Sequence, residues 1–243
     1  MAGDALNHLK RALDLIPARA PAAALMRHAE RGRFARGHHG NDIPLTPQGE
    51  RDAFAAGQLL AGRISRLLHS PVPRCLQTAE NLRRGGGVEA APMEWLGLRC
   101  DVYVGDFDSA LATLKRMVSE DGFYDRFVNR MCTAGAEAPY PHFKPPLAGT
   151  VDLLGGMLAF SRAGMCIGIT HDWLVNVAAC YATGTVTTRP NYAGFLDALF
   201  VWRRQPSWMF YYQGATGRCP PQFADSLAAS RFVTPTASPA EPR

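Results

Sequence analysis

Two short apolar runs in this chain of 243 residues each lead into a histidine. The first run, residues 23–26, is followed directly by Arg27 and His28. The second run, residues 165–169, is followed by Thr170 and then by His171. Apolar runs of this length predict buried strands. Because the carboxyl ends of parallel strands meet at one edge of a sheet, we expect both histidines at the same solvent-facing edge.

Strand and helix patterns alternate along most of the chain. Strands are expected at 23–26, 67–69, 88–93 and 165–169, and helices at 4–16, 47–62, 74–84 (stopped by the glycines at 85–87), 106–133, 150–162 and 173–181. Residues 195–203 and 208–213 flank a Gln-Pro-Ser turn and predict a β-hairpin. This alternation predicts an α/β fold with a mostly parallel sheet.

The domain organisation is expected to be simple. A single domain should span 1–233, with an insertion at about 95–147 covering one end of the sheet. Within it, residues 134–147 contain four prolines and are expected to be irregular. The last residues, 234–243, are rich in Pro, Ser, Thr and Ala, which predicts a disordered tail.

Composition narrows the class of protein. The formal charge of +5 points to an anionic partner, but the basic residues are dispersed and no nucleic-acid motif is present, so a small phosphorylated molecule is favoured over nucleic acid.

The six cysteines lack CxxC spacing and several lie in apolar surroundings, which predicts buried thiols rather than disulfides or a zinc site. No run approaches membrane-spanning length and no signal peptide is evident, so a cytoplasmic protein without a membrane partner is expected.

A third predicted strand, 67–69, completes a pocket at the sheet edge. It is followed by Ser70 and then by Arg74 at the start of a helix. Together with the histidines, the arginines Arg27, Arg31 and Arg74 would surround a common space. Guanidinium groups pair with doubly charged oxyanions, of which phosphate is the usual one.

Four segments, in order along the chain, resemble motifs of the histidine phosphatase superfamily, which includes phosphoglycerate mutases and acid phosphatases. Residues 25–30 resemble its Arg-His-Gly signature, and residues 42–49 resemble its "pLTxxG" helix start. Residues 70–79 resemble the "SxxxRxxQTA" segment, and residues 170–172 resemble the second-histidine motif. Four motifs in order are a specific signal.

The resemblance implies a three-layer α/β/α phosphoglycerate mutase-like fold with an inserted helical cap. It also implies that His28 attacks phosphorus and becomes phosphohistidine. Arg27, Arg74 and His171 would bind the phosphoryl oxygens, and Arg31 is a further candidate ligand. Water would then hydrolyse the phosphohistidine. No cofactor or metal ion is implied, since positive side chains supply the electrostatic stabilisation.

Some positions depart from the family pattern. Ala29 replaces the usual glycine, and the tryptophan-asparagine pair that often follows in mutases is missing. Arg31 and Asp172 resemble the acid phosphatase branch, whose aspartate donates the proton to the leaving group. Glu94 is the counterpart of the glutamate donor in the mutase-like branch. Asp172 is favoured over Glu94, and both remain candidates.

The resulting prediction is a metal-independent phosphomonoesterase that dephosphorylates a small phosphorylated metabolite through a phosphohistidine on His28. A phosphoglycerate mutase-like phosphotransferase and a non-catalytic phospho-ligand-binding module are the alternatives. The leaving group is open because residues 95–147 match no motif. The oligomeric state is open as well, a homo-oligomer being one option.

Overall fold

A computed structural model describes residues 2–33, 42–99, 101–119, 123–161, 163–186 and 192–231. Seven strands form one sheet in the order β3-β2-β4-β1-β5-β6-β7. In chain order the strands are β1 (Ala22–Arg27), β2 (Ile64–His69), β3 (Met93–Glu94), β4 (Met165–Thr170), β5 (Ala198–Arg204), β6 (Ser207–Tyr212) and β7 (Ala215–Arg218). The expected tail at 234–243 lies outside the described residues.

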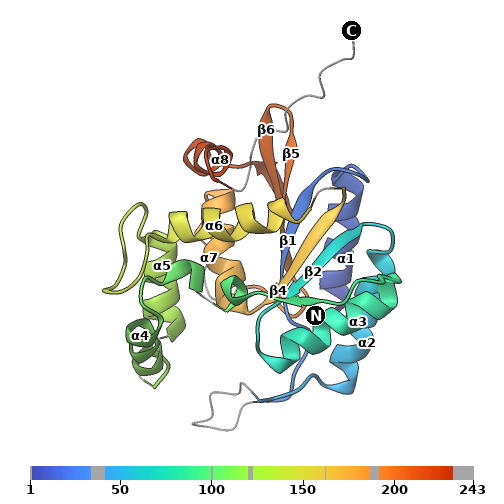
Figure 1. Cartoon of the computed structure of the whole chain (residues 1–243), viewed down its shortest axis with the longest axis horizontal. Helices are drawn as coiled ribbons and strands as arrows, with labels where there is room; N and C mark the ends of the chain where they lie inside the picture. Colours follow the sequence, from blue (N-terminus) through green and yellow to red (C-terminus); the bar gives the residue numbers. More distant parts are fainter. Residues whose placement is uncertain are drawn as a thin grey trace.

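Helices cover both faces of the sheet (Figure 1). They are α1 (Ala2–Leu15), α2 (Pro47–Leu59), α3 (Pro73–Gly86), α4 (Phe107–Ser119), α5 (Asn129–Thr133), α6 (Pro146–Ala159), α7 (Asp172–Thr183) and α8 (Pro221–Ala228). In Figure 1, α1, α2 and α3 lie on one side of β1, β2 and β4, while α6 and α7 lie on the other. The predicted α/β fold with three layers is therefore confirmed.

Alternate residues of β1 show how the layers are held together. Leu25 belongs to the apolar cluster shared with α6 and α7, whereas Ala24 and Met26 belong to the cluster shared with α1, α2 and α3. Successive side chains of a strand point to opposite faces, so one short apolar run fills two cores. Burial of both faces explains why the run lacks polar alternation.

The direction of the strands sets the site. Strands β3, β2, β4 and β1 are parallel, and β5, β6 and β7 continue the sheet in antiparallel fashion. Register pairs Arg27 of β1 with Thr170 of β4, and His69 of β2 with Ile169 of β4. The carboxyl ends of β1, β2 and β4 therefore lie level with one another, as predicted.

The glycine run at 85–87 ends α3, as predicted, and it also serves packing. The helix extends to Gly86, two residues beyond the expected end, and Gly87 caps it in the left-handed conformation with φ 63°. A Cβ on Gly85 would lie 2.0 Å from the backbone oxygen of Phe54 in α2. The close contact of α2 and α3 therefore requires glycine there.

Several predicted boundaries were wrong. The strand expected at 88–93 is reduced to Met93–Glu94, and Pro92, which has no backbone N–H, directly precedes it. The irregular segment expected to end at residue 147 ends earlier, because Pro146 occupies the first position of α6. The hairpin is confirmed, but the sequence reading missed β7 and α8.

Helical structure predominates between β3 and α6. Helices α4 and α5, with the π-helical turn Phe123–Val128 before α5, lie at one end of the molecule (Figure 1). Phe127 and Tyr103 are fully buried there and contact Trp173 of α7 at ring-centroid distances of 5.7 and 6.0 Å. The helical prediction for 106–133 holds for the described residues, while the single-domain and cap boundaries remain predictions.

Within the described residues, every helix is too short or too polar to cross a lipid bilayer.

Candidate functional site

Three polar residues directly follow the ends of three neighbouring strands. His28 follows β1, Ser70 follows β2 and His171 follows β4. The His28 amide donates to the Thr170 carbonyl at 2.9 Å, and the Ser70 amide donates to the Ile169 carbonyl at 2.9 Å. These backbone hydrogen bonds extend the sheet by one residue and fix the backbone positions of His28 and Ser70.

Arg74, in the first turn of α3, connects these side chains. Its Nε donates to Nε2 of His28 at 2.9 Å, and its Nη2 lies 3.1 Å from Nδ1 of His171. The Ser70 hydroxyl lies 3.3 Å from Nε2 of His171. The two imidazole rings meet edge to face, with centroids 5.6 Å apart. His28, Arg74 and His171 therefore form the directly bonded group that their motifs predicted.

The tautomers of both histidines follow from these bonds. A guanidinium group can only donate, so the nitrogens that contact Arg74 must be acceptors. In His28 the proton then lies on Nδ1, which donates to the Ala29 carbonyl at 2.8 Å. In neutral His171 the proton lies on Nε2, next to Ser70. His28 thus presents a lone pair at Nε2, and His171 presents a donor.

Burial and positive neighbours keep both rings neutral. Burial lowers the pKa of His28 to about 2, with further lowering by His171 and Arg74. Burial also lowers the pKa of His171 to about 3, with Arg74 as the next cause. The pKa of Arg74 is itself lowered by burial. A neutral imidazole is the nucleophilic form, and the site holds His28 in that form.

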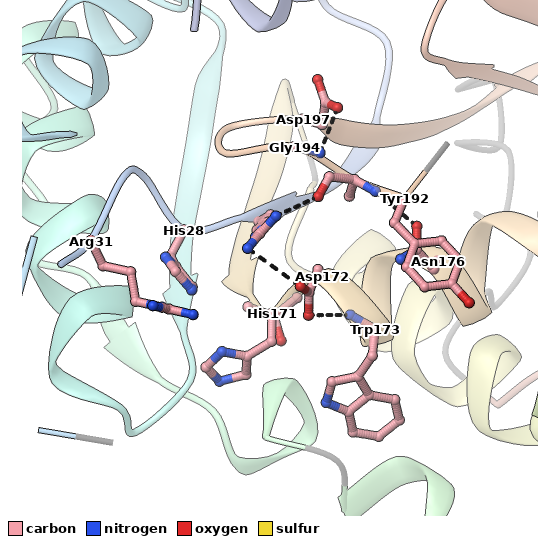
Figure 2. Close-up of polar contacts among 12 residues, drawn as sticks. His28, Arg31, His171, Asp172, Trp173, Asn176, Tyr192, Gly194 and Asp197 are labelled. Atoms are coloured by element: carbon pink, nitrogen blue, oxygen red, sulfur yellow. Dashed lines mark hydrogen bonds and ion pairs between the residues drawn. The ribbon is translucent and has the colours of Figure 1, made fainter. Parts of the chain in front are cut away.

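Arg27 lies beside this group and is held by several partners. Its Nη2 pairs with Oδ2 of Asp172 at 3.3 Å, and its Nη1 donates to the Ala193 carbonyl at 2.7 Å (Figure 2). Its guanidinium also lies 4.3 Å from the ring centre of Phe195. The other carboxylate oxygen of Asp172 accepts from the Trp173 amide at 2.8 Å. Both oxygens of Asp172 are therefore occupied.

The two remaining predicted residues lie at the margin of the group. Figure 2 shows the Arg31 side chain beside His28, where its Nη1 donates to the Gly32 carbonyl at 2.8 Å. Glu94 is exposed at the end of β3, and its register partner His69 directly precedes Ser70. Direct contacts thus join His28, Arg74 and His171 in one group and Arg27 and Asp172 in a neighbouring pair, and among the described residues none of these side chains contacts Glu94.

Other motif residues support the loop after His28. Thr78 accepts from the Ala29 amide at 3.0 Å. Thr46 donates its amide to the Glu30 carbonyl at 3.0 Å, and its hydroxyl caps α2. A Cβ on Gly49 would lie 2.1 Å from that same Glu30 carbonyl. These residues of the "pLTxxG" and "QTA" segments therefore position the backbone that carries His28.

Sequence reasoning missed three contributors to the site. Ser70 was part of a recognised motif but had no assigned role. Phe195 contacts both Arg27 and His28, whose ring centroid is 5.8 Å away. Asn176 lies in α7 and reaches the site through Ala193. Phe195 and Asn176 carry no motif signal, because only the fold brings β5 and α7 next to β1.

The thiol prediction holds for the described residues. Cys75, Cys132, Cys166, Cys180 and Cys219 are all buried and free, and burial raises the pKa of Cys75 to about 12. Among the residues that the structure describes, no cluster of three or more His, Cys, Asp or Glu side chains is arranged to hold a metal ion.

Comparison with known proteins yields one family and a set of similar folds. Residues 23–111 match the model of the histidine phosphatase superfamily (branch 1). No curated protein matches the chain in sequence. The matched range contains β1, His28 and Arg74, so it covers three of the four motifs.

Solved structures with the same fold include three at 16–17% identity. Mycobacterial hydrolase 2 aligns over 87% of this chain and 97% of its own, with 16% identity and a TM-score of 0.53. YhfR of Bacillus stearothermophilus aligns over 81% and 98%, with 16% identity and a TM-score of 0.53. A mycobacterial glucosyl-3-phosphoglycerate phosphatase aligns over 81% and 100%, with 17% identity and a TM-score of 0.52.

The family match and the geometry concern the same part of the chain. The matched range includes the motifs that contain His28 and Arg74, and the fold places His171 of the fourth motif against them. The fold is the phosphoglycerate mutase-like one that the motifs implied. Over residues 23–111 the chain therefore matches the histidine phosphatase superfamily, and the fold places residues 170–172 beside that range.

Proposed function

We propose that this histidine phosphatase hydrolyses phosphate monoesters of small molecules through a phosphohistidine on His28, without a metal ion. One observation carries the proposal. The unprotonated Nε2 of a buried, neutral His28 lies at the sheet edge, 2.9 Å from Arg74 and next to His171. A fixed nucleophile surrounded by donors suits attack on a phosphoryl group.

The reaction has two displacement steps. In the first, the Nε2 lone pair forms a bond to phosphorus while the bond to the leaving alcohol oxygen breaks, and that oxygen takes a proton from a carboxylic acid. In the second, a water oxygen bonds to phosphorus, the N–P bond breaks, and the carboxylate takes the water proton. Inorganic phosphate leaves and His28 returns to its neutral form.

Arg74 couples substrate binding to release of the nucleophile. Before substrate binds, its Nε–H occupies the lone pair of His28. A phosphoryl group offers charged oxygens, which are stronger acceptors for a guanidinium than a neutral imidazole. When substrate binds, Arg74 would give up its hydrogen bond to His28 for one to a phosphoryl oxygen. Nε2 of His28 would then be free to attack phosphorus. Arg27 and the Nε2–H of His171 would bind the remaining oxygens, so positive groups of the chain stabilise the charge.

We assign proton transfer to Glu94 and the positioning of Arg27 to Asp172. Both carboxylate oxygens of Asp172 already have partners, Arg27 and the Trp173 amide, which suits Asp172 to holding Arg27. Glu94 is an exposed carboxylate one strand from Ser70. The branch 1 family match supports the glutamate donor over the acid phosphatase aspartate that Arg31 and Asp172 favoured.

The comparisons support a small phosphate ester as substrate. A protein of the same fold is a glucosyl-3-phosphoglycerate phosphatase, and a structure of that protein holds VO3. Vanadate is an oxyanion like phosphate, which agrees with the anion-binding residues around His28.

The test is hydrolysis of p-nitrophenyl phosphate in EDTA by the wild-type protein and by His28→Ala. We expect turnover that persists in EDTA and falls by at least about 10³-fold in the variant, since the nucleophile is lost. Rapid quenching of wild type should show one added phosphoryl group in the intact mass, and the variant should show none. Full activity of His28→Ala, or activity only with added metal, would overturn the proposal.

A second assay separates the two carboxylates. An alkyl phosphate has a basic leaving group that needs a proton, whereas p-nitrophenolate does not. Glu94→Gln should therefore slow the alkyl ester by about 10²-fold and the aryl ester far less. Asp172→Asn should slow both esters alike, because it disturbs Arg27. The reverse pattern would assign the acid to Asp172.

A further inference from the structure

The segment from Tyr192 to Asp197 holds Arg27 from both ends. The Arg27 amide donates to the Asp197 carbonyl at 3.0 Å, and the Leu196 amide donates to the Arg27 carbonyl at 3.2 Å. The side chain adds the bond from Nη1 to the Ala193 carbonyl at 2.7 Å, and the Phe195 ring lies against the guanidinium. The orientation of the Arg27 guanidinium therefore depends on this segment.

The segment itself is fixed by side chains from other elements. Asp197 accepts from the Gly194 amide at 2.8 Å and from Nε2 of Gln213 at 2.9 Å. The Tyr192 hydroxyl donates to Oδ1 of Asn129 in α5 at 3.2 Å. These bonds hold its two ends, but they leave Ala193, whose carbonyl binds Arg27, to be positioned by another residue.

Asn176 of α7 is that residue. It is fully buried (Figure 2 labels it beside Tyr192), and its Oδ1 accepts from the Ala193 amide at 3.0 Å. The same oxygen accepts from the Tyr212 hydroxyl at 3.0 Å. Its Nδ2 is buried without a hydrogen-bond partner among the described residues. A buried amide with an unsatisfied donor costs about 1–3 kcal/mol, so this side chain is not explained by stability alone.

We propose that Asn176 is a positioning residue for phosphoryl transfer, which acts on Arg27 through the backbone of Ala193. The inference rests on the proposed function. Oδ1 of Asn176 holds the Ala193 amide, which lies one peptide unit before the Ala193 carbonyl. The Ala193 carbonyl then fixes Nη1 of Arg27, and Asp172 fixes Nη2. The guanidinium is thus held by an acceptor on each terminal nitrogen before substrate arrives, which lowers the cost of ordering it in the transition state.

The test is a double-mutant cycle on p-nitrophenyl phosphate with Asn176→Leu and Arg27→Met. Asn176→Leu removes the acceptor at similar volume and should lower kcat/KM at least about tenfold and weaken inhibition by inorganic phosphate. In the Arg27→Met background the same substitution should change kcat/KM less than about twofold, since its target is gone. Equal effects in both backgrounds would overturn the proposal.

Three further variants keep the test decisive. Tyr212→Phe removes one donor to Oδ1 and leaves the Ala193 bond, so it should fold and lower kcat/KM less than Asn176→Leu does. If Asn176→Leu fails to fold, its place in the cycle is taken by Asn176→Ala, which also removes the Oδ1 acceptor, with the same criterion. Ser161→Ala is the matched control, because it deletes a fully buried hydroxyl near the amino end of β4, away from the site, and should leave kcat/KM unchanged.

The same assay distinguishes the two proposals. Absence of His28-dependent turnover in wild type contradicts the proposed function. Normal His28-dependent turnover together with wild-type kinetics of Asn176→Leu contradicts only the positioning role.

Discussion

Arg74 donates from Nε to the Nε2 of His28 at 2.9 Å, so the atom expected to attack phosphorus is bonded to a cation before substrate binds. The contact is buried at both ends. It fixes the tautomer of His28 and lowers the pKa of the ring. A single arginine thus orients His28 and contacts His171, and in the proposed reaction it would also bind the phosphoryl group.

Arg74→Lys should therefore damage catalysis more than charge alone suggests. Lysine keeps the charge but cannot contact His28 and His171 with separate nitrogens of one planar group. We expect kcat/KM for p-nitrophenyl phosphate to fall by about 10²–10³-fold. Arg83 lies on the same helix and pairs with Glu80, so Arg83→Lys is the control and should leave kcat/KM unchanged. A fall below about threefold for Arg74→Lys would contradict this role.

Acid should destabilise the fold through His28 and His171. Their pKa values are about 2 and about 3 in the folded chain against an ordinary value of 6.5, so the unfolded chain binds more protons at intermediate pH. Their stabilising contribution is complete above pH 6.5 and falls as the pH drops toward 3, by at most about 1.4 kcal/mol per pH unit for each histidine.

Urea unfolding of wild type and His28→Gln between about pH 4.5 and 7.5 measures this effect. Glutamine can still accept from Arg74 but binds no proton in this range. The free energy of unfolding of the variant should fall less steeply with decreasing pH than that of wild type. Carboxylates contribute equally to both proteins, so they cancel in the difference between the two free energies. Parallel curves would show that His28 is not held neutral by the fold.

Gly49→Ala should lower both stability and activity. The added Cβ would lie 2.1 Å from the Glu30 carbonyl, a backbone atom that cannot move without shifting the loop after His28. We expect a loss of about 1–3 kcal/mol in the free energy of unfolding and reduced kcat. Gly105→Ala is the control, because its Cβ would meet the His142 carbonyl at an ordinary 3.6 Å. Unchanged thermal unfolding of Gly49→Ala would contradict the close contact.

Vanadate or inorganic phosphate should raise the melting temperature. An anion that binds only the folded state stabilises it by about 2.7 kcal/mol at a hundredfold excess over Kd. The increase should depend on Arg74, so Arg74→Gln should abolish most of it and Arg83→Gln should preserve it. An equal increase in both variants would show that the anion binds elsewhere.

The sequence determined the parts of the site that lie in continuous segments. Apolar runs of strand length, each followed by a histidine, were enough to place His28 and His171 at the same edge of a parallel sheet. Arg74 could be added because its helix follows a third strand end. Thr46 and Pro47 predicted the start of α2 correctly, and the glycines at 85–87 predicted the end of α3, but the contact of Gly85 with α2 could not be read from the sequence.

Only the tertiary structure decided how these residues act. No sequence pattern shows that Asp172 pairs with Arg27 and accepts from the Trp173 amide at the start of α7. These contacts are the reason why we propose Glu94 for proton transfer. The support of Arg27 by Ala193, Phe195 and Asn176 joins segments distant in sequence, through bonds that exist only once β5 and α7 pack against β1. Periodicity and motifs record what a segment does locally, but the pairing of buried polar atoms is settled by packing across the whole fold.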